Sequence, residues 1–266
     1  MPNTADTRTA DPAVIYDRAF VLALFARWGA VVAEAAGIRP GDRVLDVACG
    51  TGALTLAAAE HAGPEGAVSG LDPNPEMLAV ARAKPVAVDW REGRAEALPF
   101  GDATFDAVVS QFGMMFFDDA VGAFAEMHRV LAPGGRLAVA VFDAVDTAPG
   151  YDSLARLLDR QCGREIGDAM RAPFAMGDAA QLRTLAETVF ASATVSRHDG
   201  HVHFPSVADL VETEHSCIWT LGGLIGDDEA ARLREAAEHE LRPFVRPDGS
   251  ITFAMPALIV TATKTA

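Results

Sequence analysis

The stretch Val44-Leu45-Asp46-Val47-Ala48-Cys49-Gly50-Thr51-Gly52 decides the fold class of this chain of 266 residues. A short β-branched run ends in two closely spaced glycines, and an alanine-rich segment begins directly after them. This order predicts a strand, a tight loop and a helix whose N-terminus lies against a bound ligand. A second apolar run, residues 67–71, ends in Asp72, and an acidic residue at that place typically binds the two ribose hydroxyls of an adenosine cofactor.

Three classes of nucleotide site share such a glycine loop, and the flanking residues help to separate them. A P-loop closes with lysine and serine or threonine, whereas Ala53 and Leu54 follow Gly52 here. A dinucleotide site prefers a third glycine, where this chain has Thr55, so pyrophosphate binding is weakened but not excluded. In an S-adenosylmethionine site, an acidic residue before the glycines faces the cofactor's ammonium group, and Asp46 fits that role. Because a carboxylate beside phosphates is unfavourable, the residues favour the methyl donor.

Composition and charge restrict the partners. The net charge of -15, with Lys84 and Lys264 as the only lysines, argues against nucleic acid, which requires a basic surface. The three cysteines form no C-x-x-C pair, so we expect neither a disulfide framework nor a structural zinc site, and we expect a cytoplasmic protein. Residues 1–11 lack the apolar core of a signal peptide. Residues 19–37 are apolar but carry Arg27 and Glu34, which favours an amphipathic helix over membrane insertion.

Strand and helix patterns alternate in the first half of the chain, which predicts a doubly wound, mostly parallel α/β sheet covered on both faces. The expected strands are 43–48, 67–72, 86–90, 105–112 and 136–142, and the expected helices are 51–61, 75–84 and 119–131.

The second half of the chain is dominated by helical patterns, at 151–161 and after Asp178, Ser206 and Asp227. Residues 193–204 resemble a strand broken at Asp199-Gly200, and residues 251–264 resemble one long strand in which Pro256 indicates a bulge or a late start. We therefore expect an N-terminal helical cap (1–37), a cofactor-binding core (38–142), and helical lid segments with the last strands (143–266).

Five motifs in unbroken order resemble class I S-adenosylmethionine-dependent methyltransferases, in particular the small-molecule branch that includes ubiquinone and menaquinone C-methyltransferases. They cover roughly residues 38–142 and comprise the stretches 44–52, 70–78, 92–100, 105–111 and 126–136. The resemblance implies a Rossmann-like methyltransferase fold, S-adenosyl-L-methionine as cofactor, and a small, largely apolar or aromatic acceptor of quinone or natural-product type. It implies no metal. Besides the small acceptor, the expected partners include, as an option, a second copy of the chain in a homodimer.

The resemblance also assigns roles to cofactor-binding residues. Asp46 faces the ammonium end, Asp72 holds the ribose hydroxyls, and Gln111 lies beside the methionine portion. Met77 and the backbone of Arg94 and Ala95 contact the adenine. The glycine loop and the turn after Asp72 complete the predicted set with Ala48, Gly50, Thr51, Gly52 and Pro73.

One residue departs from the family pattern. Members often carry aspartate at the position of Arg94, where it accepts a hydrogen bond from the adenine amino group, and arginine has donors only. Glu96 or a backbone carbonyl is the expected replacement.

No catalytic residue is assigned, because methyl transfer by in-line displacement depends mainly on alignment. His215, beside two glutamates, and Tyr151 are the candidates for a general base, whereas packing is favoured for His128 and the His198, His201 and His203 cluster. A nicotinamide-dependent oxidoreductase and a non-catalytic S-adenosylmethionine-binding module are the alternative functions.

Overall fold

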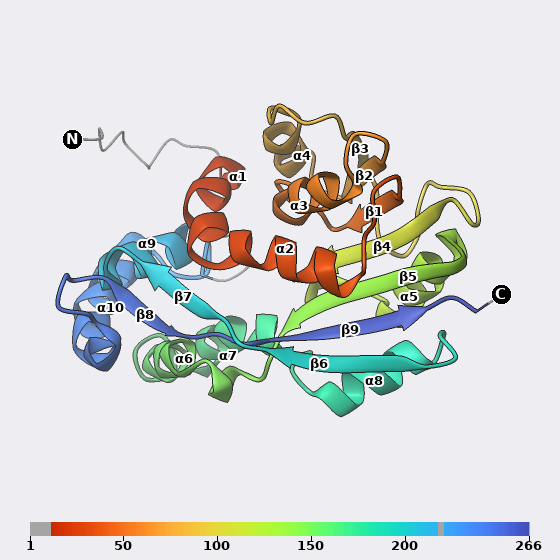
Figure 1. Cartoon of the computed structure of the whole chain (residues 1–266). Coiled ribbons are helices and arrows are strands. Elements are labelled where there is room, and N and C mark those ends of the chain that lie inside the picture. The colour runs from red at the N-terminus through yellow and green to blue at the C-terminus, as the bar shows by residue number, and fades with distance from the viewer. Residues whose placement is uncertain (1–11, 218–220, 266) are drawn as a thin grey trace. The chain divides into compact units, whose positions relative to one another are not determined.

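The computed structural model describes residues 12–217 and 221–265 of the chain (Figure 1). These residues group into two compact units. The first, called the sheet unit, comprises residues 25–144, 173–200 and 256–265. The second, called the helical unit, comprises residues 12–24, 145–172 and the described part of 201–255. The boundaries differ from the three predicted segments because each unit is assembled from three separate pieces of the chain.

The sheet unit is built on a seven-stranded sheet in the order β3-β2-β1-β4-β5-β9-β6. The first five of these strands are parallel, and β9 runs antiparallel to both of its neighbours. This arrangement confirms the predicted mostly parallel α/β fold. The strands are β1 (Arg43–Val47), β2 (Ala67–Asp72), β3 (Asp89–Glu92), β4 (Phe105–Gln111), β5 (Leu131–Phe142), β6 (Ala193–His198) and β9 (Ala257–Thr263).

Helices cover the sheet on both faces (Figure 1). Helices α2 (Ala26–Ala35) and α3 (Ala53–Ala62) pack on each other, and α3 packs on β1 and β2. Helices α5 (Ala120–Val130) and α8 (Ala179–Glu187) likewise pack on each other, and α4 (Pro75–Arg82) packs on β2 and β3. The central strands are apolar on both faces, and Val44, Leu45 and Val47 are fully buried.

Side-chain caps define the starts of several helices. The Asn74 side chain accepts hydrogen bonds from the backbone N–H groups of Glu76 and Met77 at the start of α4. Asp119 caps α5 and Asp178 caps α8 in the same way. A 3-10 turn, η3 (Met114–Phe116), follows β4, and of the apolar run that it contains, Met114 is buried in the core.

The helical unit contains the helices α1 (Pro12–Ile15), α6 (Pro149–Gln161), α7 (Arg164–Arg171), α9 (Val207–Ser216) and α10 (Asp227–Glu240). It also contains a two-stranded antiparallel sheet of β7 (His201–Phe204) and β8 (Ile251–Ala254). The shorter 3-10 turns are η4 (Val145–Thr147), η5 (Ala172–Phe174) and η6 (Arg242–Phe244). Between α1 and α2 the chain forms π-helical turns over η2 (Tyr16–Phe25), so the predicted amphipathic helix begins earlier and is irregular.

Three predicted strands are wrong in their boundaries, and one of them, expected at 136–142, already begins at Leu131 as β5. The expected strand 251–264 is two strands in different sheets, because the chain leaves β8 at Met255-Pro256 and a proline cannot continue the backbone ladder. The expected strand 86–90 lies three residues later, where the parallel register sets Trp90 opposite Gly70. A Cβ atom on Gly70 would lie 2.6 Å from the Trp90 ring, so this register depends on the missing side chain.

Candidate cofactor-binding site

The glycine loop reverses the chain at the carboxyl end of β1 through alternate residues with positive φ. Ala48, Gly50 and Gly52 have φ angles of 58°, 54° and 91°, and Gly52 is the N-cap of α3. Such angles suit glycine but cost an alanine about 1–2 kcal/mol. Ala48 is therefore a strained residue within the predicted site, held against Gly113 after β4, where an added Cβ would lie 2.6 Å from the Ala48 Cβ atom.

Asp72, the last residue of β2, ties the glycine loop to the turn before α4. Its carboxylate accepts hydrogen bonds from the backbone N–H of Gly50 at 2.8 Å and of Asn74 at 2.9 Å. Burial raises the pKa of Asp72, while these two N–H groups favour its ionised form. Each carboxylate oxygen has a further lone pair for a ligand hydroxyl. Of the other residues predicted here, Met77 is buried on α4 and Pro73 is exposed.

Asp46 is fully buried on β1, and only one of its carboxylate oxygens has a partner in the protein. Oδ2 accepts a 2.6 Å hydrogen bond from the Thr55 hydroxyl, and Oδ1 has no partner. Burial is the main cause that raises the pKa of Asp46 to about 7, and the nearby negative charge of Asp72 adds to it against the Thr55 bond. A cation placed at Oδ1 would stabilise the ionised carboxylate.

Four buried polar side-chain atoms in the described residues of the sheet unit have no hydrogen-bond partner, and all lie in or beside the same region. They are Asp46 Oδ1, Thr51 Oγ1, Ser110 Oγ and Gln111 Oε1. Strands β1 and β4 are neighbours, so these atoms share one edge of the sheet. An unsatisfied buried polar atom typically costs about 1–3 kcal/mol. Their concentration at the carboxyl ends of parallel strands makes this edge the candidate ligand site.

The loop after β3, which is predicted to contact the adenine, holds Arg94, Ala95 and Glu96 in different surroundings. The Ala95 side chain is buried, whereas the Arg94 side chain is more than half exposed. Arg94 donates to Asp118 at 2.5 Å and lies 3.4 Å from Glu96, whose other oxygen accepts from the Asp118 N–H at 2.9 Å. These contacts hold Glu96 in place, and each of its oxygens keeps a further lone pair, so Glu96 and a backbone carbonyl both stay as the expected replacements for the missing aspartate.

The two candidate general bases both belong to the helical unit. Tyr151 is buried and donates a 2.7 Å hydrogen bond to Glu214, and burial together with that carboxylate raises its pKa well above the usual value. A ring nitrogen of His215 lies 3.3 Å from the Ile225 carbonyl oxygen. The expected carboxylate neighbours of His215 have other partners, because Glu212 pairs with Arg234 at 2.7 Å and Glu214 binds Tyr151.

His128 and His198 make contacts within the protein. His128 is half-buried on α5 with its ring 5.0 Å from that of Phe190, and burial lowers its pKa. His198 hydrogen-bonds Ser196 at 2.9 Å.

Residues 12–217 and 221–265 contain no cluster of three or more histidine, cysteine or acidic residues arranged to hold a metal ion. No helix in the same ranges combines the length and hydropathy that crossing a bilayer requires.

Three residues that support this site were missed by sequence reasoning. Ser110 adds a buried hydroxyl, Lys84 Nζ donates a 2.7 Å hydrogen bond to the Thr51 carbonyl, and the Trp90 ring covers the glycine loop. A Cβ atom on Gly52 would lie 2.7 Å from that ring, so Gly52 is glycine for packing as well as for its φ angle. The paired glycines at 52 and 70 are the sequence signal that could have indicated a large ring between them.

Comparisons with known proteins place residues 44–135 in the family described as "Methyltransferase domain". The chain is 46% identical over 121 residues to the ubiquinone/menaquinone biosynthesis C-methyltransferase UbiE of Teredinibacter turnerae, covering 43% of this chain and 49% of that protein. It is 38% identical over 121 residues to the 2-phytyl-1,4-naphtoquinone methyltransferase of a Synechocystis species, covering 43% and 51%. The chain thus spans about half the length of these curated relatives.

Solved structures share the fold. The YcgJ protein of Bacillus subtilis has a TM-score of 0.61 at 19% identity, over 90% of this chain and 99% of that one. A methyltransferase-like protein of Bacillus halodurans gives the same TM-score at the same identity. Together with the family match, these findings confirm the predicted resemblance to class I S-adenosylmethionine-dependent methyltransferases.

Proposed function

We propose that this chain, whose residues 44–135 form an S-adenosylmethionine-dependent methyltransferase domain, methylates a small, largely apolar or aromatic acceptor of quinone type. The domain supports the methyl donor as cofactor, and the acceptor class is drawn from the curated relatives, which are named for ubiquinone, menaquinone and naphthoquinone methylation. The predicted cytoplasmic location and homodimer stand as further proposals.

The observation that carries the proposal is the pair of buried acceptors, Asp46 Oδ1 and Gln111 Oε1, which lack protein partners. An ammonium group has three donors and no acceptor, so it complements two unsatisfied oxygens. A pyrophosphate would instead place negative charge beside the Asp46 carboxylate. These acceptors therefore favour the amino-acid end of S-adenosylmethionine over a nicotinamide dinucleotide.

The other predicted residues fit the rest of the cofactor. Asp72 would accept from the ribose hydroxyls while its bonds to Gly50 and Asn74 keep the carboxylate oriented. Met77 and the backbone at Ala95 would line the adenine, and the Thr51 hydroxyl would bind a polar group of the cofactor. Each assignment uses a group that is buried or already fixed, so little conformational entropy is lost on binding.

When bound, S-adenosylmethionine would supply a methyl group on a positively charged sulfur: the acceptor's carbon, oxygen or nitrogen bonds to the methyl carbon in line as the carbon–sulfur bond breaks, and S-adenosylhomocysteine leaves. The protein's contribution is to hold donor and acceptor in alignment, which can lower the barrier by roughly 7–11 kcal/mol in the best cases. An acceptor that is already nucleophilic requires no side-chain base. This agrees with Tyr151 and His215 being occupied by contacts within the helical unit.

Methyl transfer to a demethylated naphthoquinol tests the proposal. The purified chain is incubated with S-adenosylmethionine and the acceptor, and the product is identified by a mass increase of one methyl substitution. Asp72→Ala should abolish turnover, whereas Asp106→Ala, which removes an ion pair with Arg43 at the opposite end of the strands, should retain it. Binding of S-adenosylmethionine with no transfer to any acceptor in a quinol, phenol and amine panel would indicate a binding module, and NAD-dependent turnover would indicate an oxidoreductase.

A further inference from the structure

The loop that carries the proposed adenine contacts is attached to α5 by side chains. It spans residues 93–104, between β3 and β4, and only an isolated bridge between Arg94 and Ala97 gives it strand-like pairing. Glu126 and Arg129, three residues apart on α5, face this loop. We infer that Glu126 and Arg129 are positioning residues for cofactor binding, acting through the loop, an inference that rests on the proposed function.

Glu126 and Arg129 form a forked ion pair that is itself directed at the loop. Arg129 Nε and Nη2 donate to the two oxygens of Glu126 at 2.7 Å and 2.8 Å. The Leu98 N–H donates to Glu126 Oε2 at 2.8 Å, and Arg129 Nη2 donates to the Leu98 carbonyl at 3.0 Å. Both backbone polar groups of Leu98 are therefore satisfied by one side-chain pair, as a neighbouring strand would satisfy them.

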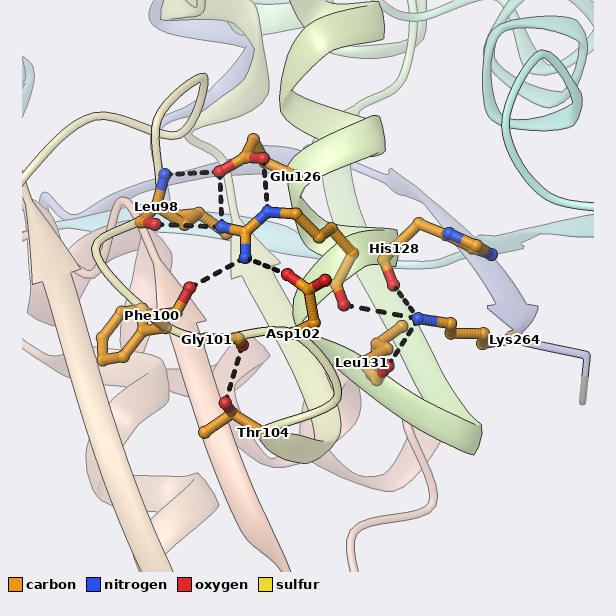
Figure 2. Close-up of polar contacts among 10 residues, drawn as sticks. Leu98, Phe100, Gly101, Asp102, Thr104, Glu126, His128, Leu131 and Lys264 are labelled. Carbon is orange, nitrogen blue, oxygen red and sulfur yellow. Dashed lines mark hydrogen bonds and ion pairs between the residues drawn. The ribbon is translucent and has the colours of Figure 1, made fainter.

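Further contacts extend this attachment along the loop. Arg129 Nη1 donates to the Phe100 carbonyl and to Asp102 Oδ1, both at 2.8 Å. Figure 2 shows Leu98, Phe100, Asp102 and Glu126 gathered around this guanidinium. The backbone N–H of Thr104 then binds the Val130 carbonyl at 2.8 Å. Arg129 uses all three guanidinium nitrogens, and lysine could not reproduce this planar arrangement.

The proposed adenine residues lie between two fixed points. On one side the Asp118 backbone N–H, just before α5, binds Glu96, and on the other side Glu126 and Arg129 bind Leu98. The Glu126 pKa is lowered by Arg129, so the pair is ionised at neutral pH. Loss of Arg129 would remove the side-chain hydrogen bonds to the Phe100 and Leu98 carbonyls and the ion pair of Glu126, and would leave only the Leu98 N–H bond between α5 and this part of the loop. The loop would then have to be ordered by the cofactor, at the expense of affinity.

Lys264 provides a matched control at the same end of the same helix. Its Nζ donates to the carbonyls of His128, Arg129 and Leu131 at 2.9 Å, 3.3 Å and 2.8 Å. Figure 2 shows Lys264 on the side of the helix end away from the loop residues. Removing this cation weakens the end of α5 but leaves the contacts of Glu126 and Arg129 with the loop in place.

The test compares Arg129→Met, Glu126→Gln and Lys264→Met with the wild-type protein. Calorimetry gives the Kd for S-adenosylhomocysteine, hydrogen exchange gives the protection of residues 93–104, and thermal unfolding gives Tm. We expect Arg129→Met to weaken binding by roughly tenfold or more and to speed exchange in the loop. Glu126→Gln should do so to a smaller extent, and Lys264→Met should lower Tm while keeping Kd within about twofold.

Three outcomes separate the claims. If Arg129→Met and Glu126→Gln lower Tm but bind S-adenosylhomocysteine like Lys264→Met, the pair is only structural and the inference is wrong. If Arg129→Met does not fold, Glu126→Gln decides in its place. If the wild-type protein itself does not bind S-adenosylhomocysteine, the proposed function fails and the inference fails with it.

Discussion

The sheet unit and the helical unit differ in how they satisfy their buried polar groups. At the carboxyl edge of the sheet, Asp46 and Gln111 each retain a buried oxygen without a protein partner. In the helical unit, buried Tyr151 donates directly to buried Glu214. The first arrangement leaves acceptors for donors from outside the protein, such as a ligand or water, whereas the Tyr151–Glu214 hydrogen bond is made within the protein. The comparison supports the proposed location of the cofactor site in the sheet unit.

The family match separates the two units in the same way. Residues 44–135 lie entirely in the sheet unit, and the helical unit lies outside the matched residues. Cofactor binding depends on a few charges and φ angles at fixed places in the chain. Selection of an acceptor depends on packed apolar surfaces, which vary without leaving a motif. The matched residues therefore include every residue that is proposed to contact the cofactor.

The largest expected effect follows from removing Asp72 in the sheet unit. Asp72→Ala deletes the proposed acceptor for two ribose hydroxyls and releases the Gly50 and Asn74 N–H groups. Because a hydrogen bond to a charged group contributes about 1.5–3 kcal/mol, we expect the Kd for S-adenosylhomocysteine to rise roughly 100-fold or more.

Calorimetric titration measures this effect, with Asp106→Ala as the control. Asp106 and Arg43 form a partly exposed ion pair at the amino ends of β4 and β1, so its loss should leave Kd unchanged. Equal weakening by both variants would show that the effect is a general loss of sheet stability.

Asp46 should make cofactor binding depend on pH. Its folded-state pKa of about 7 exceeds the unfolded value of about 3.9, so this group lowers the stability of the ligand-free protein as pH rises through that interval. A bound ammonium requires the ionised carboxylate. The affinity for S-adenosylhomocysteine should therefore increase with pH, by up to about tenfold per unit, until the pKa is passed.

Asp46→Asn is the matched variant for that dependence, because it retains an acceptor oxygen but does not titrate. Calorimetry between about pH 5.5 and 7.5 should show that the affinity of this variant for S-adenosylhomocysteine does not change with pH. At about pH 7.5 the variant should bind roughly 10-fold or more weakly than the wild-type protein. An unchanged pH dependence in this variant would assign the titration to another group.

Tyr151→Phe tests whether the buried hydrogen bond of the helical unit serves stability and not cofactor binding. The variant leaves Glu214 without the 2.7 Å hydrogen bond from the tyrosine, so the free energy of unfolding should fall by about 1–3 kcal/mol. The Kd for S-adenosylhomocysteine should stay the same, because the change lies in the helical unit. Chemical denaturation and calorimetry on the same preparation measure both quantities. A loss of cofactor affinity at unchanged stability would place Tyr151 in the cofactor site instead.

Arg94→Ala should have the smallest effect, although the residue lies within the proposed site. Its guanidinium is more than half exposed and pairs with Glu96 and Asp118 near the surface, where such pairs contribute less than about 1 kcal/mol. If the adenine is bound by the loop backbone, Kd should change by no more than about twofold. A change of tenfold in calorimetry would indicate that the side chain itself contacts the cofactor.

The sequence predicted those parts of the fold and site that depend on local chemistry. The positive φ angles at Gly50 and Gly52, the buried acids Asp46 and Asp72, and the capping role of Asn74 all follow from short motifs. Their physical requirements involve neighbouring residues along the chain, so they can be inferred without a structure.

Long-range packing explains what could not be predicted. The position of β3 depends on Trp90 packing against Gly52 and Gly70, and the division of residues 251–264 depends on which sheet each half joins. Ser110 was missed because a serine in an apolar strand carries no signal until its hydroxyl is found without a partner. The link between Arg129 and the loop spans 31 residues and likewise has no local signature.

Calorimetric titration of the wild-type protein with S-adenosylhomocysteine, with NAD as the comparison ligand, tests the central claim most directly. The account predicts binding of S-adenosylhomocysteine at one site per chain, with a micromolar or tighter Kd (about −8 kcal/mol), and no binding of NAD. Binding of NAD in its place would contradict the assignment of Asp46 and Gln111 to an ammonium group, and the glycine loop would then be a dinucleotide site.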